Sequence, residues 1–97
     1  MNLFKGQYRT GGIYLALYTA EEGEPYSDVT VNIPPFTTDN VIALNGDFNN
    51  YVDEDLKDAV LNKLHAEFLA NVPSGYTTFP LYGIDMKVVE NIPELAW

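Results

Sequence analysis

The chain has 97 residues, with 14 acidic side chains against five basic ones and a net charge of −9 at pH 7. This balance excludes direct binding to DNA or RNA, because affinity for nucleic acid depends on Lys and Arg neutralising phosphates. The absence of cysteine excludes disulfides, thiolate zinc sites and cysteine nucleophiles. The hydrophobic fraction of 46% is that of a globular protein, so we expect a single domain over residues 1–97.

The longest apolar run lies at residues 13–20 and is too short for a helix that crosses a membrane. No basic segment followed by an apolar one predicts a signal peptide. We therefore expect a cytoplasmic protein that does not bind membranes.

Two strands joined by an acidic turn are the first elements that the sequence predicts. Side chains alternate along residues 12–20, with Ile and Leu on one face and Tyr, Ala and Tyr on the other. After the turn "EEGEP", residues 26–33 alternate again, with Val, Val and Ile on the face expected to be buried. Pro34 and Pro35 end this strand, because proline cannot donate to a ladder. Residues 3–8 are expected to add an N-terminal strand.

A second hairpin is predicted in "VIALNGDFNNYV", residues 41–52. Its turn would be Asn45-Gly46, because a type I′ turn needs two residues that adopt positive φ. The alternation ends after this segment, and a helical period follows it.

The predicted helix runs from Asp53 to about residue 70. Apolar residues recur there at every fourth position and form one stripe: Leu56, Val60, Leu64 and Phe68. Asp53 is a suitable N-cap, and the acids after it favour the positive end of the helix dipole. "NVPSG" at residues 71–75 ends the helix, because proline and glycine do not continue it comfortably.

The stretch "SGYTTFPLYG" after this helix is predicted to be the last strand. Alternation places Phe79 and Leu81 on the side of the core under the helix. Tyr76 and Tyr82 then lie on the wetter side. Pro80 limits pairing, so the strand is expected at a sheet edge or bent. Together these elements predict an α+β fold: a small antiparallel sheet of about four to six strands, rich in hairpins, with one amphipathic helix on its apolar face.

Residues suited to catalysis or metal binding are few. His65, the only histidine, is expected to be a partly exposed helix residue near Asp58, with no nucleophile beside it. Residues 47–58 place acids at several positions of a calcium-binding loop, but Tyr51 and Val52 stand where that loop needs a ligand and a glycine. We therefore expect no enzyme activity, no bound metal and no cofactor.

Acidic residues form two groups, one around the turn of the first hairpin as far as Asp28 and one at the start of the helix. The groups are either a solvated turn and a dipole-matched helix end, or two contact surfaces for a partner protein with a basic surface. The tyrosines favour the second interpretation, because Tyr is enriched at interfaces. The candidate partner-binding residues are Glu21, Glu22, Glu24, Tyr26, Asp53, Glu54, Asp55, Asp58, Tyr76 and Tyr82.

Two segments, "EEGEPYSDVTVNIP" and "PSGYTTFPLYGI", carry a resemblance to a known family. The chain resembles a family of domains of about its own length and of unknown function, which are encoded on phages and conjugative elements of bacteria. The matching positions are Gly23, Pro25, Tyr26, Asn32, Ile33 and Pro34, then Gly75, Tyr76, Pro80, Leu81 and Tyr82. The resemblance implies an accessory protein of a mobile element in a bacterial host, and it supplies no catalytic residues.

Three functions follow as hypotheses. The leading one is a binder of a host protein, for example an inhibitor of a CRISPR nuclease or a restriction enzyme, which needs no active site. The second is a protein that self-associates through its sheet edges, with a homodimer as the simplest form. The third is a domain that sequesters a small molecule in a pocket lined by Tyr and Phe. Trp97 is expected either to pack on the sheet or to anchor a partner.

Overall fold

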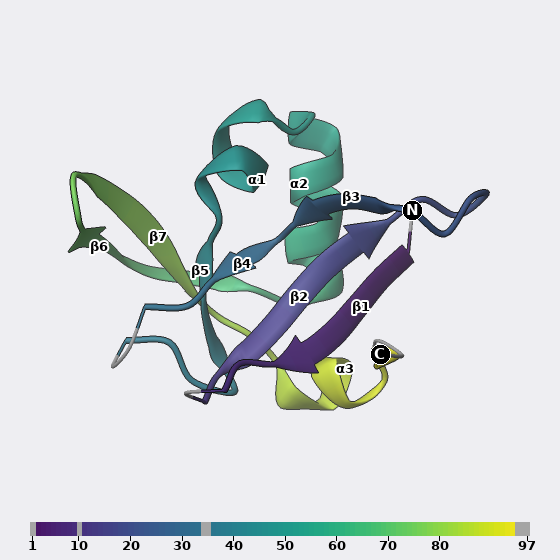
Figure 1. Ribbon diagram of the computed structural model, residues 1–97. Helices are drawn as coiled ribbons and strands as arrows, with labels where there is room; N and C mark the ends of the chain where they lie inside the picture. Colours follow the sequence, from purple (N-terminus) through teal and green to yellow (C-terminus); the bar gives the residue numbers. More distant parts are fainter. Residues whose placement is uncertain (1, 10, 34–35, 95–97) are drawn as a thin grey trace.

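Two small antiparallel sheets and three short helices make up the described part of the chain, residues 2–9, 11–33 and 36–94 (Figure 1). In this computed structural model the Cα radius of gyration is 12.6 Å. The strands are β1 (Asn2–Gln7), β2 (Ile13–Tyr18), β3 (Pro25–Asp28), β4 (Thr30–Val31), β5 (Val41–Leu44), β6 (Glu67–Ser74) and β7 (Thr77–Gly83). The helices are α1 (Gly46–Tyr51), α2 (Glu54–Lys63) and α3 (Met86–Glu90). The predicted α+β class is confirmed, and the predictions for Pro34, Pro35 and Trp97 fall outside the described residues.

The first sheet, with strand order β1-β2-β3, forms one layer of the fold. β2 and β3 pair as the predicted first hairpin, and β1 is the predicted N-terminal strand. As predicted, Ile13, Leu15 and Leu17 of β2 are buried in the core. Alternation therefore turns the tyrosines of β2 to the opposite, outer face of this sheet.

The second strand of the predicted first hairpin is divided between the two sheets. β3 ends at Asp28, and β4 begins at Thr30 in the second sheet. Val29 is buried between them; its N–H donates to Leu15 O (2.9 Å), and its carbonyl accepts from Asn45 N–H (2.9 Å). One residue thus hydrogen-bonds to both layers and links them.

The predicted second hairpin is wrong, because β5 is followed by helix α1. The Asn45 side chain accepts a hydrogen bond from Asp47 N–H (3.0 Å) and caps α1, so Gly46 is a helical residue instead of part of a type I′ turn. Phe48 of α1 is fully buried in the core. Asn suits both an N-cap and a tight turn, and the burial of Phe48 favours the helix.

Helix α2 is shorter than predicted and ends at Lys63 instead of near residue 70. His65, two residues later, is not helical: its φ is +50°, the left-handed conformation that commonly follows a helix. The His65 N–H donates to Asn62 O (3.1 Å), and the next N–H donates to Leu61 O (2.9 Å), which is the hydrogen bonding of a Schellman motif. Although the apolar spacing continues to Phe68, the chain after this motif pairs as a strand.

β6 and β7 form a long hairpin where the sequence predicted the end of the helix and the last strand. Its turn contains Gly75 with φ +63°. The second sheet has the order β4-β5-β7-β6, and β7 lies inside it only where residues 81–83 pair with β5. Residues 77–80 pair with β6 alone, so the predicted edge at Pro80 is confirmed. Pro80 directly precedes Leu81, the first residue of β7 that pairs with β5, so its missing N–H removes no bond to β5.

The two faces of β7 point into different apolar clusters. Phe79 and Leu81 belong to a small cluster on one face of the second sheet, so the prediction that they lie in the core under the helix is wrong. Tyr82, on the other face, packs partly buried against the main core, which includes α2. Sequence alternation separated the two faces correctly, but the helix covers the tyrosine face.

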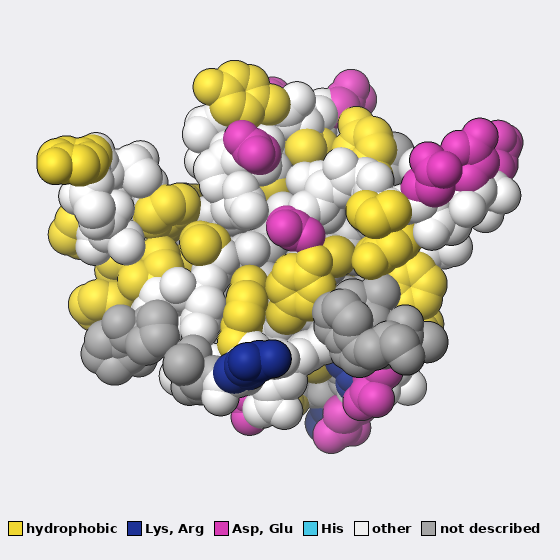
Figure 2. Space-filling model, viewed as in Figure 1, with side chains coloured by type: hydrophobic (Ala, Val, Ile, Leu, Met, Phe, Trp, Pro, Cys, Tyr) yellow, Lys and Arg dark blue, Asp and Glu magenta, His cyan; other side chains and the backbone are white. Residues whose placement is uncertain are grey.

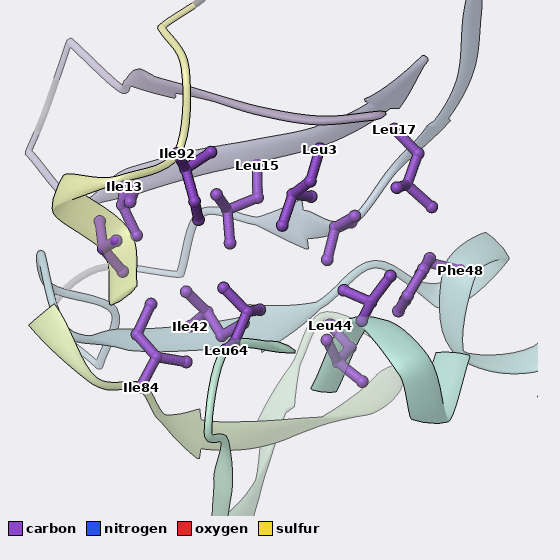
Figure 3. Packing of buried hydrophobic residues seen from close by; sticks show 13 residues of the cluster. Leu3, Ile13, Leu15, Leu17, Ile42, Leu44, Phe48, Leu64, Ile84 and Ile92 are labelled. Atoms are coloured by element: carbon purple, nitrogen blue, oxygen red, sulfur yellow. The ribbon is translucent and has the colours of Figure 1, made fainter. Parts of the chain in front are cut away.

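The main core lies between the two sheets (Figure 3). Side chains from β1 and β2 point toward those from β5, α1 and α2. Its largest fully buried members are Leu15, Val29, Ile42, Leu44, Phe48 and Leu64. Only the inner face of the first sheet takes part in this core, so its outer face is left for other contacts.

Candidate partner-binding surface

The outer face of the first sheet carries four aromatic side chains that alternate with buried core residues. Phe4 lies on β1, and Tyr8 follows this strand. Tyr14 and Tyr18 lie on β2. The rings of Phe4 and Tyr18 meet edge to face with centroids 5.4 Å apart, and those of Tyr8 and Tyr14 meet at 5.5 Å. All four are partly exposed and belong to neither apolar cluster, and we call them the aromatic face.

The aromatic face is turned away from α2. In Figure 1 the strands β1 and β2 lie in front of this helix, and in Figure 2 hydrophobic side chains gather over β2. Because α2 packs on the inner side of the first sheet through the main core, no described helix covers the aromatic face.

A carboxylate, Asp28, lies beside these rings. Tyr14 Oη donates to Asp28 Oδ1 (2.5 Å), and Tyr8 Oη donates to the carbonyl oxygen of Thr30 (3.2 Å). Burial raises the pKa of Tyr8 and of Tyr14 above the ordinary tyrosine value, and for Tyr14 the hydrogen bond to the Asp28 carboxylate raises the pKa further. At neutral pH this face therefore presents uncharged hydroxyls and one exposed carboxylate.

The loop between β2 and β3 carries the first predicted acidic group, Glu21, Glu22 and Glu24, all exposed. Figure 2 shows acidic side chains projecting from the molecule where this loop leaves the sheet. Thr19 orders the loop, because its hydroxyl accepts from Glu24 N–H (3.1 Å) and its own N–H donates to Glu24 O (2.8 Å). The three carboxylates thus stand at one end of the aromatic face on a loop with a defined backbone.

Tyr26 joins the acidic loop to the aromatic face. It lies on β3 and is 48% exposed. A shallow groove beside it is lined by Asp28 and, from the start of α1, by Asn45 and Asp47. Helix α1, which replaces the predicted second hairpin, therefore brings a further carboxylate to this side of the molecule.

The second predicted acidic group lies in a different layer, at the start of α2. Asp53 Oδ1 accepts from Asp55 N–H (2.8 Å) and confirms the predicted N-cap. Glu54 and Asp55 occupy the first turn, where the helix dipole favours carboxylates. Asp58 is exposed further along the helix. Asp53, Glu54 and Asp55 thus have a structural role at the helix start that the loop glutamates do not have.

The two candidate tyrosines of the last strand are separated. Tyr76 lies in the turn of the β6–β7 hairpin and is fully exposed. Tyr82 packs edge to face against Phe68, with centroids 5.7 Å apart, and is partly buried against the main core. Of the two, Tyr76 is the one whose ring is free to reach a partner.

The candidate metal and histidine sites were checked over the part of the chain that the structure describes. No group of three or more His, Asp or Glu side chains there could hold a metal ion. His65 pairs with Asp85 instead of Asp58 (Nδ1–Oδ2, 3.6 Å), and both side chains are exposed. Among the same residues no helix has the length and apolar character needed to span a bilayer.

A family model for a domain of unknown function, DUF4313, matches residues 4–94. The chain belongs to the DUF4313 family. No curated protein and no solved structure matches it significantly. The DUF4313 match confirms the predicted resemblance to a small domain of unknown function, and it spans all of α1, α2, α3 and the second sheet.

Sequence reasoning on this DUF4313 chain did not single out the aromatic face. The alternation of β2 already placed Tyr14 and Tyr18 on one side, and the same period along β1 would have placed Phe4 beside them. The missing information was that no described helix covers this side, which depends on where α1 and α2 pack.

Proposed function

We propose that this DUF4313 domain is a non-enzymatic protein that binds a partner with a basic surface. The observation that supports this best is the aromatic face, which no described helix covers, on the first sheet of a chain with net charge −9, and which ends at the acidic loop. The contact surface in this proposal is the aromatic face together with Tyr26, Asp28 and the loop glutamates.

The chemistry of this surface suits arginine and lysine side chains of a partner. Their cationic groups are attracted to the faces of aromatic rings, and an arginine stacked on Tyr14 or Tyr26 would lie close to the Asp28 carboxylate. Glu21, Glu22 and Glu24 would attract the basic partner before contact and orient it. Tyrosine provides a large contact area at low entropic cost, which is why it recurs in interface hot spots.

The biological setting that we propose is a mobile genetic element in the cytoplasm of a bacterial host, which rests on the sequence resemblance. A host defence nuclease is then a suitable partner, since its nucleic-acid-binding groove is basic and an acidic protein can occupy it. The α2 acids Asp53, Glu54, Asp55 and Asp58 and the exposed Tyr76 would be secondary contacts. Sequestration of a small molecule stays a prediction, and no observation favours it.

Charge reversal of the loop tests the proposal. The variant Glu21→Lys/Glu22→Lys/Glu24→Lys should lose the basic proteins that the wild-type domain captures from a bacterial lysate, as measured by quantitative mass spectrometry. A matched control reverses three exposed acids elsewhere, Asp39, Glu67 and Glu90, and changes the net charge equally.

The control variant should keep those partners. Retention by both variants would show that the loop makes no contact. Loss from both would show that overall charge, and not this surface, governs capture, which would also overturn the assignment.

A further inference from the structure

The β6–β7 hairpin differs from the rest of the chain in charge. The chain contains 19 charged side chains if the Lys, Arg, Asp and Glu totals are combined, but residues 68–84 contain none. In Figure 2 the part of the surface over this hairpin shows hydrophobic and uncharged side chains, without acidic or basic ones. A strongly acidic chain repels its own copies wherever carboxylates face each other, and this hairpin is a region where such repulsion is weakest.

The outer edge of β6 is free in the described structure, because β6 is the last strand of the second sheet. Other edges are short or covered. Along β1, Lys5 N–H donates to Pro93 O (2.9 Å), and Lys5 pairs with Glu94 in a parallel bridge. β3 has four residues and β4 has two, whereas β6 has eight. A strand of this length with unpaired backbone groups is a template for another strand.

Two large apolar side chains are exposed on this edge strand. Phe68 is 52% exposed and Leu69 is 50% exposed. Phe68 packs against Tyr82, while Leu69 approaches Gly83, and these are consecutive residues of β7 that face opposite sides of the sheet. One apolar side chain thus lies on each face of the sheet, where a strand added at the edge would cover part of both.

We propose that two copies of this chain associate by antiparallel pairing of their β6 edges about a two-fold axis. The paired segment is residues 68–72, with the two-fold axis at Ala70. Beyond it Glu67 of one copy lies opposite Pro73 of the other, and pairing ends there because proline cannot donate. A second copy fits this edge better than a basic partner does, since the segment offers no carboxylate to a lysine or arginine. A two-fold axis places each segment opposite itself, so one uncharged apolar patch serves both chains.

The experiment is sedimentation equilibrium of the purified chain from about 5 to about 200 µM, a range in which a moderate dimer dissociates on dilution. The expected mass rises with concentration from 10.9 kDa toward twice that value. Leu69→Lys should remain at 10.9 kDa throughout, because the pairing would bury two ammonium groups as diagonal neighbours on either side of the axis at Ala70. Tyr76→Lys, in the hairpin turn and outside the paired segment, should dimerise like the wild type.

A wild-type mass of 10.9 kDa at every concentration would overturn the proposal, as would a Leu69→Lys variant that dimerises normally. Circular dichroism confirms that each variant is folded. If Leu69→Lys does not fold, Ala70→Lys takes its place, since Ala70 is exposed on the same segment. Loss of dimer in Ala70→Lys supports the β6 edge, and retention rejects it.

Discussion

The aromatic face of the first sheet and the β6–β7 hairpin of the second both expose aromatic or apolar side chains, but their charges differ. The aromatic face holds Asp28 and ends at three loop glutamates, whereas residues 68–84 carry no charge. Exposed aromatic residues alone therefore do not identify a partner. The surrounding charges distinguish a surface suited to a basic protein from one at which two acidic chains can meet.

The largest expected effect is on stability, and it shows whether both surfaces belong to one cooperatively folded unit. Phe48→Ala leaves a cavity in the main core between the sheets and should lower the free energy of unfolding by about 3–5 kcal/mol. Tyr51→Ala, on the same helix but 83% exposed, should change it by less than about 0.5 kcal/mol. Urea unfolding monitored by circular dichroism measures both. Two separate wild-type transitions would mean that the sheets unfold independently, and the two surfaces would then not belong to one cooperative unit.

Salt should act on the two surfaces in opposite directions. Raising NaCl from about 0.1 M to about 1 M shortens the Debye length from about 10 Å to about 3 Å. We expect the affinity for a basic partner to fall by about tenfold and the dimer to strengthen by a similar factor, because repulsion between two chains of charge −9 is screened. Partner titration and sedimentation equilibrium measure the two changes. If high salt weakens the dimer, charge pairs hold it and the hairpin assignment fails.

A smaller effect separates the two acidic groups. Asp53→Ala removes the N-cap of α2 and should lower the free energy of unfolding by about 1 kcal/mol. Glu22→Ala in the loop should change it by less than about 0.5 kcal/mol, because this exposed side chain caps no helix. Thermal and urea unfolding compare the variants. An equal loss in both would show that the loop acids are structural as well.

The smallest effect concerns the aromatic face at alkaline pH. Because the folded pKa of Tyr14 is raised, the unfolded chain releases this proton at a lower pH than the folded chain does. The stability that protonated Tyr14 contributes is therefore complete below the ordinary pKa of about 10 and is lost as the pH rises through the folded value. Between about pH 8 and about pH 10.5, the urea midpoint should fall more for the wild type than for Tyr14→Phe. Equal decreases would argue against the contact between Tyr14 and Asp28.

Predictions succeeded where the interacting residues lie close along the chain. The first hairpin, the strand β1 and the N-cap at Asp53 are confirmed, and each depends on an alternation or a cap that spans few residues. Asn45-Gly46 was assigned to the wrong structure because an N-cap and a type I′ turn use the same residues. The choice depends on Phe48, whose burial requires the distant first sheet.

Part of the candidate site was predicted correctly, again where the residues lie close together along the chain. The loop glutamates and Tyr26 are exposed on one hairpin, as local sequence indicated. Tyr82 was expected on the wetter side, yet it packs against Phe68, because residues thought to continue α2 form β6 instead. Apolar residues do recur at helical spacing up to Phe68, but the pairing of β6 with β7 outweighs this local preference.

By itself, the sequence determined the charge of the surface, the faces of β2 and β7, and the beginning of α2, since these depend on composition and on short repeats. Only the tertiary structure decided where α2 ends, which cluster receives each face of β7, and which sheet face the described helices leave open. Those outcomes depend on strand pairing and burial between segments far apart in the chain, and a local pattern carries no information about which distant segment will cover it.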